Sequence, residues 1–135
     1  MRRVVLDTNV LVSGLLSDSG PPARILDLWI GGEVQLVTDT RIEREYRDVL
    51  ARRTLGIPPE AAAHILDLLD YAEQVVALPL PVRLPDGDDE PFLEVAVAAA
   101  ADALVTGNVR HFAVRGTRWP VRVLTPREFI DQLRS

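Results

Sequence analysis

The stretch that decides the fold is Val4-Val5-Leu6-Asp7-Thr8-Asn9-Val10, close to the start of the chain. Its first three residues are apolar and two of them are β-branched, which is typical of a strand buried in a parallel sheet. The run ends abruptly at Asp7, so three hydrogen-bonding side chains are expected at the carboxyl end of that strand. The apolar stretch over residues 10–16 predicts a short helix.

Apolar runs of strand length alternate with amphipathic helical segments along the rest of the chain. Further strands are expected over residues 34–37, 74–78, 103–105 and 121–124. Helices are expected to begin near Pro21, Thr40, Pro58, Pro91 and Thr125, with capping boxes formed by Thr40 with Glu43 and by Thr125 with Glu128. Alternation of this kind predicts an α/β fold of three layers, α/β/α, whose central sheet has about five mostly parallel strands.

Composition limits the chemistry that the chain can perform. Its 135 residues fit one domain, residues 1–135. There is no cysteine, and all fifteen basic residues are arginine, so thiolate and Schiff-base chemistry are excluded. The two histidines are too few for a zinc site built from histidine.

The charge balance argues against nucleic-acid binding by bulk positive charge, because the formal net charge is −5. It does not exclude nucleic-acid chemistry, since bound metal ions can reverse the sign of an acidic pocket. No stretch reaches the length of about 18 apolar residues that a membrane span needs, and the first residues do not resemble a signal peptide. We therefore expect a cytoplasmic protein that does not bind membranes.

Two carboxylates stand at positions where a structural role competes with a functional one. Asp7 follows the first strand, where it could cap the next helix or serve a site at the edge of the sheet. Glu45 shares the helix flank of Ile42 and Val49 and should turn partly inward, although a solvent-facing glutamate in exposed ion pairs is the simpler and more usual interpretation.

A run of acids, Asp86-Gly87-Asp88-Asp89-Glu90, precedes the helix that begins near Pro91. The helix dipole and capping account for one or two acids at a helix start, but not for four. Asp7, Glu45 and Asp89 can converge on the carboxyl edge of the sheet, where their repulsion calls for a proton or a divalent cation. Ligands that are all oxygen favour Mg²⁺ or Mn²⁺, and such ions can activate water and neutralise a phosphate.

Four segments together resemble the PIN-domain family of metal-dependent ribonucleases, in particular the bacterial VapC-like toxins of toxin–antitoxin pairs. The segments are residues 4–13, residues 45–50, residues 88–96 and residues 101–108, and the likeness extends to about Leu133. The resemblance implies metal ligands at Asp7, Glu45 and Asp89, with Asp86 and Asp88 as alternatives to Asp89. It also implies an RNA substrate, one or two Mg²⁺ or Mn²⁺ ions, a small antitoxin protein as partner, and a homodimer.

Asn108 departs from the family pattern, because many members carry an acid at this position. Its amide could still position a water or bind metal, so we count it among the catalytic candidates. Asp102 is expected either to support the site or to pack at the start of its strand. His111 could contact RNA, although a surface histidine without a catalytic role is the simpler interpretation. Five arginines could contact phosphates, although solvated faces and ion pairs are the usual role of such residues: Arg41, Arg44, Arg110, Arg115 and Arg118.

Two other functions compete with the nuclease. A phosphatase or receiver-type domain would use Asp7 as a nucleophile, but it needs a second aspartate two residues later or a lysine, and the chain has Asn9 and no lysine. A catalytically degenerate PIN scaffold would bind RNA or a protein without cleaving, and the missing acid at Asn108 keeps this alternative open.

Overall fold

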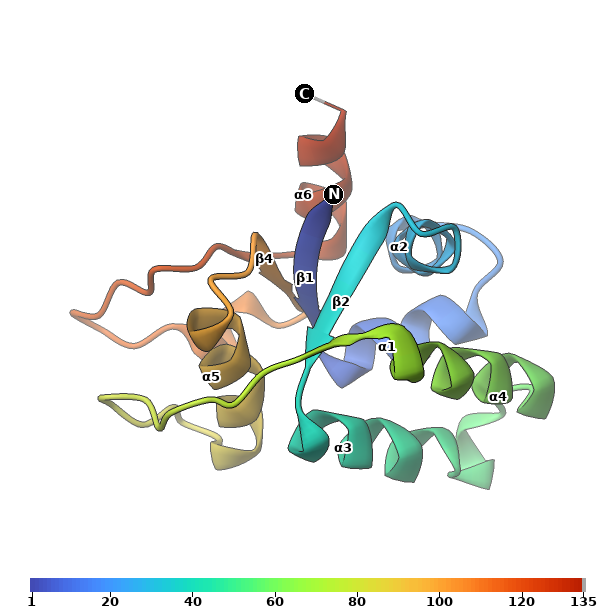
Figure 1. Cartoon of the computed structure of the whole chain (residues 1–135), viewed down its shortest axis with the longest axis horizontal. Coiled ribbons are helices and arrows are strands. Elements are labelled where there is room, and N and C mark those ends of the chain that lie inside the picture. Colours follow the sequence, from blue (N-terminus) through green and yellow to red (C-terminus); the bar gives the residue numbers. More distant parts are fainter. Residues whose placement is uncertain (135) are drawn as a thin grey trace.

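The computed structural model describes residues 1–134 and consists of a parallel sheet between two layers of helices (Figure 1). The sheet has five strands in the order β3-β2-β1-β4-β5, and every neighbouring pair is parallel. The strands are β1 (Arg2–Leu6), β2 (Val34–Thr38), β3 (Glu73–Gln74), β4 (Ala103–Val105) and β5 (Val123–Leu124). The three-layer α/β/α fold predicted from the alternation of segments is confirmed.

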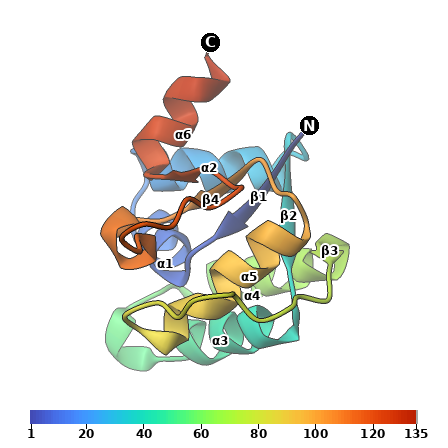
Figure 2. The same ribbon diagram turned by 90° about the vertical axis from the view of Figure 1, so that its left-hand side faces the viewer.

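Helices cover both faces of the sheet, as Figure 2 shows from the side. The helix bounds are α1 (Thr8–Leu16), α2 (Pro21–Ile30), α3 (Thr40–Leu50), α4 (Pro59–Leu68), α5 (Glu90–Ala98) and α6 (Pro126–Leu133). Helices α2 and α6 pack against one face, while α5 packs against the other and α3 contacts both α1 and α5. The middle strands β1, β2 and β4 are almost completely buried at their carboxyl ends, which explains their continuous apolar sequences.

Local signals placed most elements correctly, and the differences have physical reasons. The capping box at Thr125 and Glu128 is formed in full. The cap of α3, in contrast, is Asp39 rather than the predicted Thr40, because the Asp39 carboxylate accepts a hydrogen bond from Ile42 N at 3.0 Å. The strand predicted near residues 74–78 is only Glu73–Gln74, because pairing with β2 stops where β2 ends at Thr38.

The order of the strands fixes where a site can form. The chain starts in the middle of the sheet with β1, builds outward through β2 and β3, and then returns to the other side of β1 with β4 and β5. The change of direction therefore falls between β1 and β4. In open α/β sheets, ligands bind outside the carboxyl ends of the strands at such a switch point. Asp7 directly follows β1 and Thr106 directly follows β4, so both stand at this place.

Within residues 1–134, none of the helices has both the length and the apolar character that a membrane crossing requires.

Gly14 is required by the close approach of α1 to α2. A Cβ atom built on Gly14 would lie 2.8 Å from Leu26 Cγ and 2.9 Å from the Pro22 carbonyl oxygen. We predict that Gly14→Ala lowers the free energy of unfolding by about 1–3 kcal/mol, although alanine is the better helix former. Urea unfolding of the two proteins measures the difference.

The exposed neighbour Ser13 provides the control, because Ser13→Ala changes helix propensity without meeting α2. Equal stability of Gly14→Ala and Ser13→Ala would contradict the close packing of these helices.

Candidate metal-binding site

Asp7 lies at the carboxyl end of β1 with only 7% of its surface exposed. Its Oδ2 accepts a hydrogen bond from the hydroxyl of Thr106 at 2.7 Å, across the switch point between β1 and β4. Asp7 occupies the N-cap position of α1, but its side chain makes no capping hydrogen bond. Its carboxylate thus faces the edge of the sheet and binds Thr106, and the nearby backbone N–H groups of Thr8 and Asn9 at the start of α1 lower its pKa.

Glu45 is half-buried on α3 and turns toward the same edge. The hydroxyl of Thr8 donates a hydrogen bond to Glu45 Oε2, which links α3 to the residue directly after Asp7. The next residue on the helix, Tyr46, is fully buried and donates its phenolic hydrogen to the carbonyl of Leu6. Two adjacent residues of α3 are therefore tied to the end of β1, so Glu45 is not the solvent-facing glutamate of the simpler interpretation.

Asp89 is the third acid of this edge and the one with an unsatisfied atom. It lies where the short 3-10 helix Gly87–Asp89 meets α5, with a side chain 16% exposed. Its Oδ2 is buried, and no residue of the described chain donates a hydrogen bond to it. Nδ1 of His111 is 3.7 Å away, which is too far for a hydrogen bond.

The charges of these acids act on one another. Burial, followed by the negative charges of Asp7 and Asp86, raises the pKa of Asp89 to about 6, and Glu45 acts in the same direction. Burial also raises the pKa of Asp7, against the lowering effect of the Thr106 hydrogen bond. Neighbouring carboxylates with raised pKa values are the pattern that a functional site produces.

Asp86 and Asp88 differ from Asp89 in their surroundings. Oδ1 of Asp86 accepts a hydrogen bond from Asp88 N at 2.9 Å and so closes the turn that starts the 3-10 helix. Both side chains are exposed. Of the three acids that the sequence could not separate, Asp89 is the one with a buried carboxylate oxygen that lacks a hydrogen-bond partner in the described chain.

The residues present fit a hard divalent cation. In residues 1–134, no three acidic or histidine side chains are already arranged around one ion position, so the carboxylates would have to move together to share a metal. The orphaned Oδ2 of Asp89 is the observation that favours such a ligand, because a buried carboxylate oxygen without a partner is costly. Asp7, Glu45 and Asp89 offer only oxygen donors, which suit Mg²⁺ or Mn²⁺.

Asn108 and Asp102 lie in different environments. Asn108 is exposed just beyond Thr106, and its backbone N–H donates to Thr106 Oγ1 at 3.0 Å. Its side chain makes no capping bond to the 3-10 helix Val109–Phe112. Asp102 accepts a hydrogen bond from Arg3 N at 2.8 Å, beside the start of β1 and before the start of β4. The expectation that Asp102 supports the site is therefore wrong, and its alternative role at the strand start is the correct one.

Sequence reasoning missed the contacts that hold the acids in place. Thr8 was expected only as one of the polar side chains at the end of the first strand, and no contact was predicted for Tyr46. For Tyr46 the signal was present, since a tyrosine in the buried stripe of a helix usually places its hydroxyl against a partner. Arg41 forms ion pairs with Asp39 at 2.9 Å and Glu94 at 2.7 Å, which is the structural alternative to a phosphate contact.

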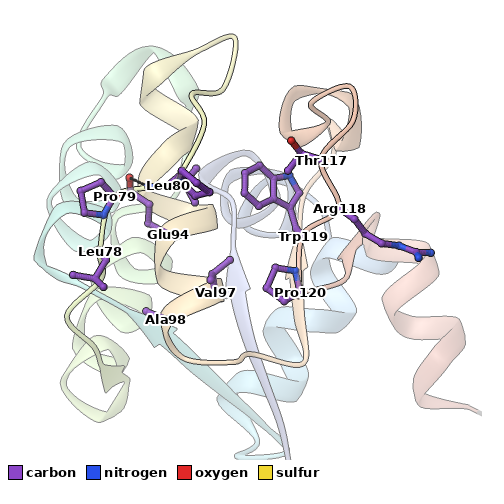
Figure 3. Close-up of a pocket in the computed structure, with 11 residues that line it drawn as sticks. Leu78, Pro79, Leu80, Glu94, Val97, Ala98, Thr117, Arg118, Trp119 and Pro120 are labelled. Atoms are coloured by element: carbon purple, nitrogen blue, oxygen red, sulfur yellow. Dashed lines mark hydrogen bonds between the residues drawn. The ribbon is translucent and has the colours of Figure 1, made fainter.

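An apolar groove of about 400 Å³ lies away from these carboxylates (Figure 3). Trp119 and Leu80 face each other across it, and Val97 of α5 lies along its floor. The indole N–H of Trp119 donates to the carbonyl of Phe112 at 2.8 Å, which fixes the ring. Glu94 also lines the groove but is already paired with Arg41, so the groove offers packing surface rather than a second acidic site.

Comparison with known proteins identifies the family. The sequence model of the PIN domain matches residues 3–110, and the chain therefore belongs to the PIN-domain family. A protein of Methanocaldococcus jannaschii, described as uncharacterized, is 28% identical over 145 aligned positions that cover 96% of this chain and 90% of that protein. The crystal structure of VapBC2 from Rickettsia felis, bound to a DNA fragment from its promoter, matches with a TM-score of 0.59. That match has 13% identity and covers 91% of this chain and 98% of the other, so it supports the fold.

The raised pKa of Asp89 predicts how stability changes with pH in the absence of metal. Between about pH 4 and 6 the folded chain keeps a proton on Asp89 that the unfolded chain has released. Protonation therefore favours the folded state, and the contribution of Asp89 to the free energy of unfolding is lost as the pH rises through 6. We predict that Asp89→Asn removes this decline and is more stable than the wild type above pH 6. Thermal unfolding in EDTA from pH 4 to 8 measures it.

Asp88→Asn is the matched control, because Asp88 is the adjacent acid and is exposed. It should keep the decline of the wild type. If Asp89→Asn also kept that decline, the shared electrostatic site around Asp89 would be disproved.

Proposed function

We propose that this chain is an endoribonuclease that depends on Mg²⁺ or Mn²⁺ and acts as the toxin of a toxin–antitoxin pair. One observation carries the proposal. In a chain of the PIN-domain family, a buried carboxylate oxygen of Asp89 has no hydrogen-bond partner within residues 1–134 and lies among the charges of Asp7 and Glu45. An acidic site of this kind, at the switch point of a parallel sheet, suits a divalent cation and a phosphate ester.

Each residue has a role that follows from its contacts. Asp7, Glu45 and Asp89 would hold the cation, which supplies activation of water and neutralisation of phosphate charge when it is bound. Thr106 and Thr8 fix one oxygen each of Asp7 and Glu45 by their hydroxyl hydrogen bonds. The carboxylates are thereby oriented before the substrate arrives, which lowers the cost of assembling the site.

Asp89 is the proposed ligand whose Oδ2 is not fixed by a hydrogen bond in the described chain. With a pKa of about 6 it is mostly ionised at neutral pH, so it can bind a cation without first losing a proton. Binding would also relieve its repulsion with Asp7. We place Asn108 at the rim, where its exposed amide can hold a water or a phosphate oxygen.

A catalytically degenerate PIN scaffold is the second candidate. It is favoured by Asn108, which puts an uncharged and exposed amide where many family members have an acid. The two functions differ in a single measurement, since only the nuclease cleaves RNA when Mn²⁺ is added.

The toxin role rests on the resemblance to VapC-like toxins and on the fold shared with VapBC2. It implies a small antitoxin protein that covers the acidic edge. A homodimer remains a prediction from the same resemblance, as does the assignment of residues 1–135 to a single nuclease unit.

Replacing Asp7 tests the proposed chemistry. Asp7→Asn keeps the shape of the side chain and can still accept from Thr106, but it removes the charge that a cation needs. We predict that the variant stays folded and loses Mn²⁺-dependent cleavage of single-stranded RNA by at least a hundredfold, since loss of a metal ligand or its support costs 10–100-fold or more. Gel analysis of a labelled RNA, with circular dichroism for the fold, measures both.

Asp102→Asn serves as the control, because Asp102 is an acid at the opposite end of β4 from Thr106. It should cleave like the wild type. Near-normal cleavage by Asp7→Asn would remove Asp7 from the metal site, and loss of folding would favour a structural role.

Replacing Asn108 tests whether the departure from the family pattern matters. Asn108→Asp adds a fourth carboxylate near a site with three, so it should bind divalent metal more tightly. We predict a lower Mn²⁺ concentration for half-maximal cleavage, together with a slightly lower melting temperature without metal because of added repulsion. Titrations of cleavage against Mn²⁺ that superimpose for both proteins would show that Asn108 lies outside the site.

A further inference from the structure

We infer that a polar groove along α3 is the binding site for the sugar-phosphate backbone of the RNA strand next to the cleavage position, with Arg44 as its main phosphate contact. This inference rests on the proposed nuclease function and adds the path of the substrate. The groove has a volume of about 670 Å³, large enough for one or two nucleotides. Its lining consists of Thr8, Arg41, Arg44, Glu45, Asp48, Val49, Arg52 and Asp88.

The groove is continuous with the proposed metal site. Thr8 and Glu45, which are hydrogen-bonded to each other, form part of its wall. From Glu45 to the end of α3 at Leu50 the helix axis advances about 7.5 Å. A nucleic-acid strand that rises about 3.4 Å per nucleotide covers this length with about two nucleotides. A strand whose phosphate lies at Glu45 can therefore have neighbouring phosphates at Arg44, one residue before Glu45, and at Arg52, just beyond the end of α3.

The charges of the groove are not equivalent. Arg41 has a side chain that is 44% exposed, and it is held by Asp39 and Glu94, so its charge is already balanced by two carboxylates. Arg52 pairs with Asp48 at 3.6 Å, but both side chains are mostly exposed, and such pairs are weak and easily replaced.

Arg44 is the arginine of the groove that makes no ion pair within residues 1–134. It is exposed on α3, one residue from Glu45. A free guanidinium beside a group of carboxylates that would bind a cation is placed to take a phosphate, for which its planar fork is suited. Among the arginines that the sequence offered as phosphate contacts, the structure thus assigns the role to Arg44 and removes Arg41.

A single strand fits this place better than a duplex does. Asp7 is 7% exposed and Thr106 is completely buried, so the reacting phosphate has to descend to the edge of the sheet. A flexible strand can bend to reach it, while its other phosphates stay on α3. Recognition through the backbone predicts weak sequence preference and a marked dependence on salt.

The test measures RNA binding without cleavage. A fluorescently labelled oligouridylate of eight nucleotides is titrated with the protein in EDTA, and the dissociation constant is followed by anisotropy at several salt concentrations from 20 mM upward. We expect Arg44→Ala to weaken binding at least threefold and to reduce the slope of log K against log salt by about 0.7, the loss of one contact to a single strand. Arg44→Lys should recover part of the binding because the charge returns.

Arg47→Ala is the matched control. Arg47 lies on the same helix, is exposed, and likewise makes no ion pair in the described chain, but it does not line this groove. It should bind the oligouridylate like the wild type. Equal effects of Arg44→Ala and Arg47→Ala, or no binding by the wild type at any salt concentration, would overturn the inference.

A competition arm separates RNA from an acidic protein partner. An octaglutamate peptide should displace the oligouridylate poorly, and displacement at equal concentration would overturn the assignment to RNA. Because binding is read without metal, the result is independent of cleavage. If the chain binds RNA through Arg44 but does not cleave it in Mn²⁺, the inference about the groove stands and the proposed nuclease function is contradicted.

Discussion

The hydrogen bond from Thr106 to Asp7 is the contact on which the rest of the site depends. It joins the carboxyl ends of β1 and β4, the two neighbouring strands between which the chain reverses its direction of growth across the sheet. The neighbouring segments start from this contact. Helix α1 begins directly after Asp7, and Asn108 donates its backbone N–H to the hydroxyl of Thr106. In an open parallel sheet, ligands bind outside the carboxyl ends of the strands, and here that edge carries the carboxylate of Asp7.

The second constraint is the repulsion among the acids that gather there. Tyr46 and Thr8 bring α3 close to the end of β1, and the 3-10 helix before α5 brings Asp89 toward Asp7. The fold thus places like charges together and leaves one buried oxygen unsatisfied. Such an arrangement lowers the stability of the fold by itself. Destabilising groups of this kind cluster at functional sites. A bound cation would turn the same repulsion into attraction.

Local sequence patterns predicted the layers, the middle strands and the position of Asp7, because buried parallel strands and their polar ends are short-range signals. They could not separate Asp86, Asp88 and Asp89, since the difference between these acids is burial against distant elements. The same limit explains the wrong expectation for Asp102: its partner, Arg3, is 99 residues away in sequence. The predicted cap of α3, Thr40, was wrong by a single residue because the cap is Asp39, and an error of this size is within the usual precision of helix ends.

A crystal soaked in Mn²⁺ tests the central claim most directly, because anomalous scattering locates the ion without reference to catalysis. The account predicts a peak at the carboxyl edge of β1, with oxygen atoms of Asp7, Glu45 and Asp89 drawn to about 2.0–2.2 Å from it and Asp89 Oδ2 among the ligands. Data that show the ion elsewhere, or no ion at this edge with Asp89 Oδ2 still unpartnered at saturating Mn²⁺, would contradict it.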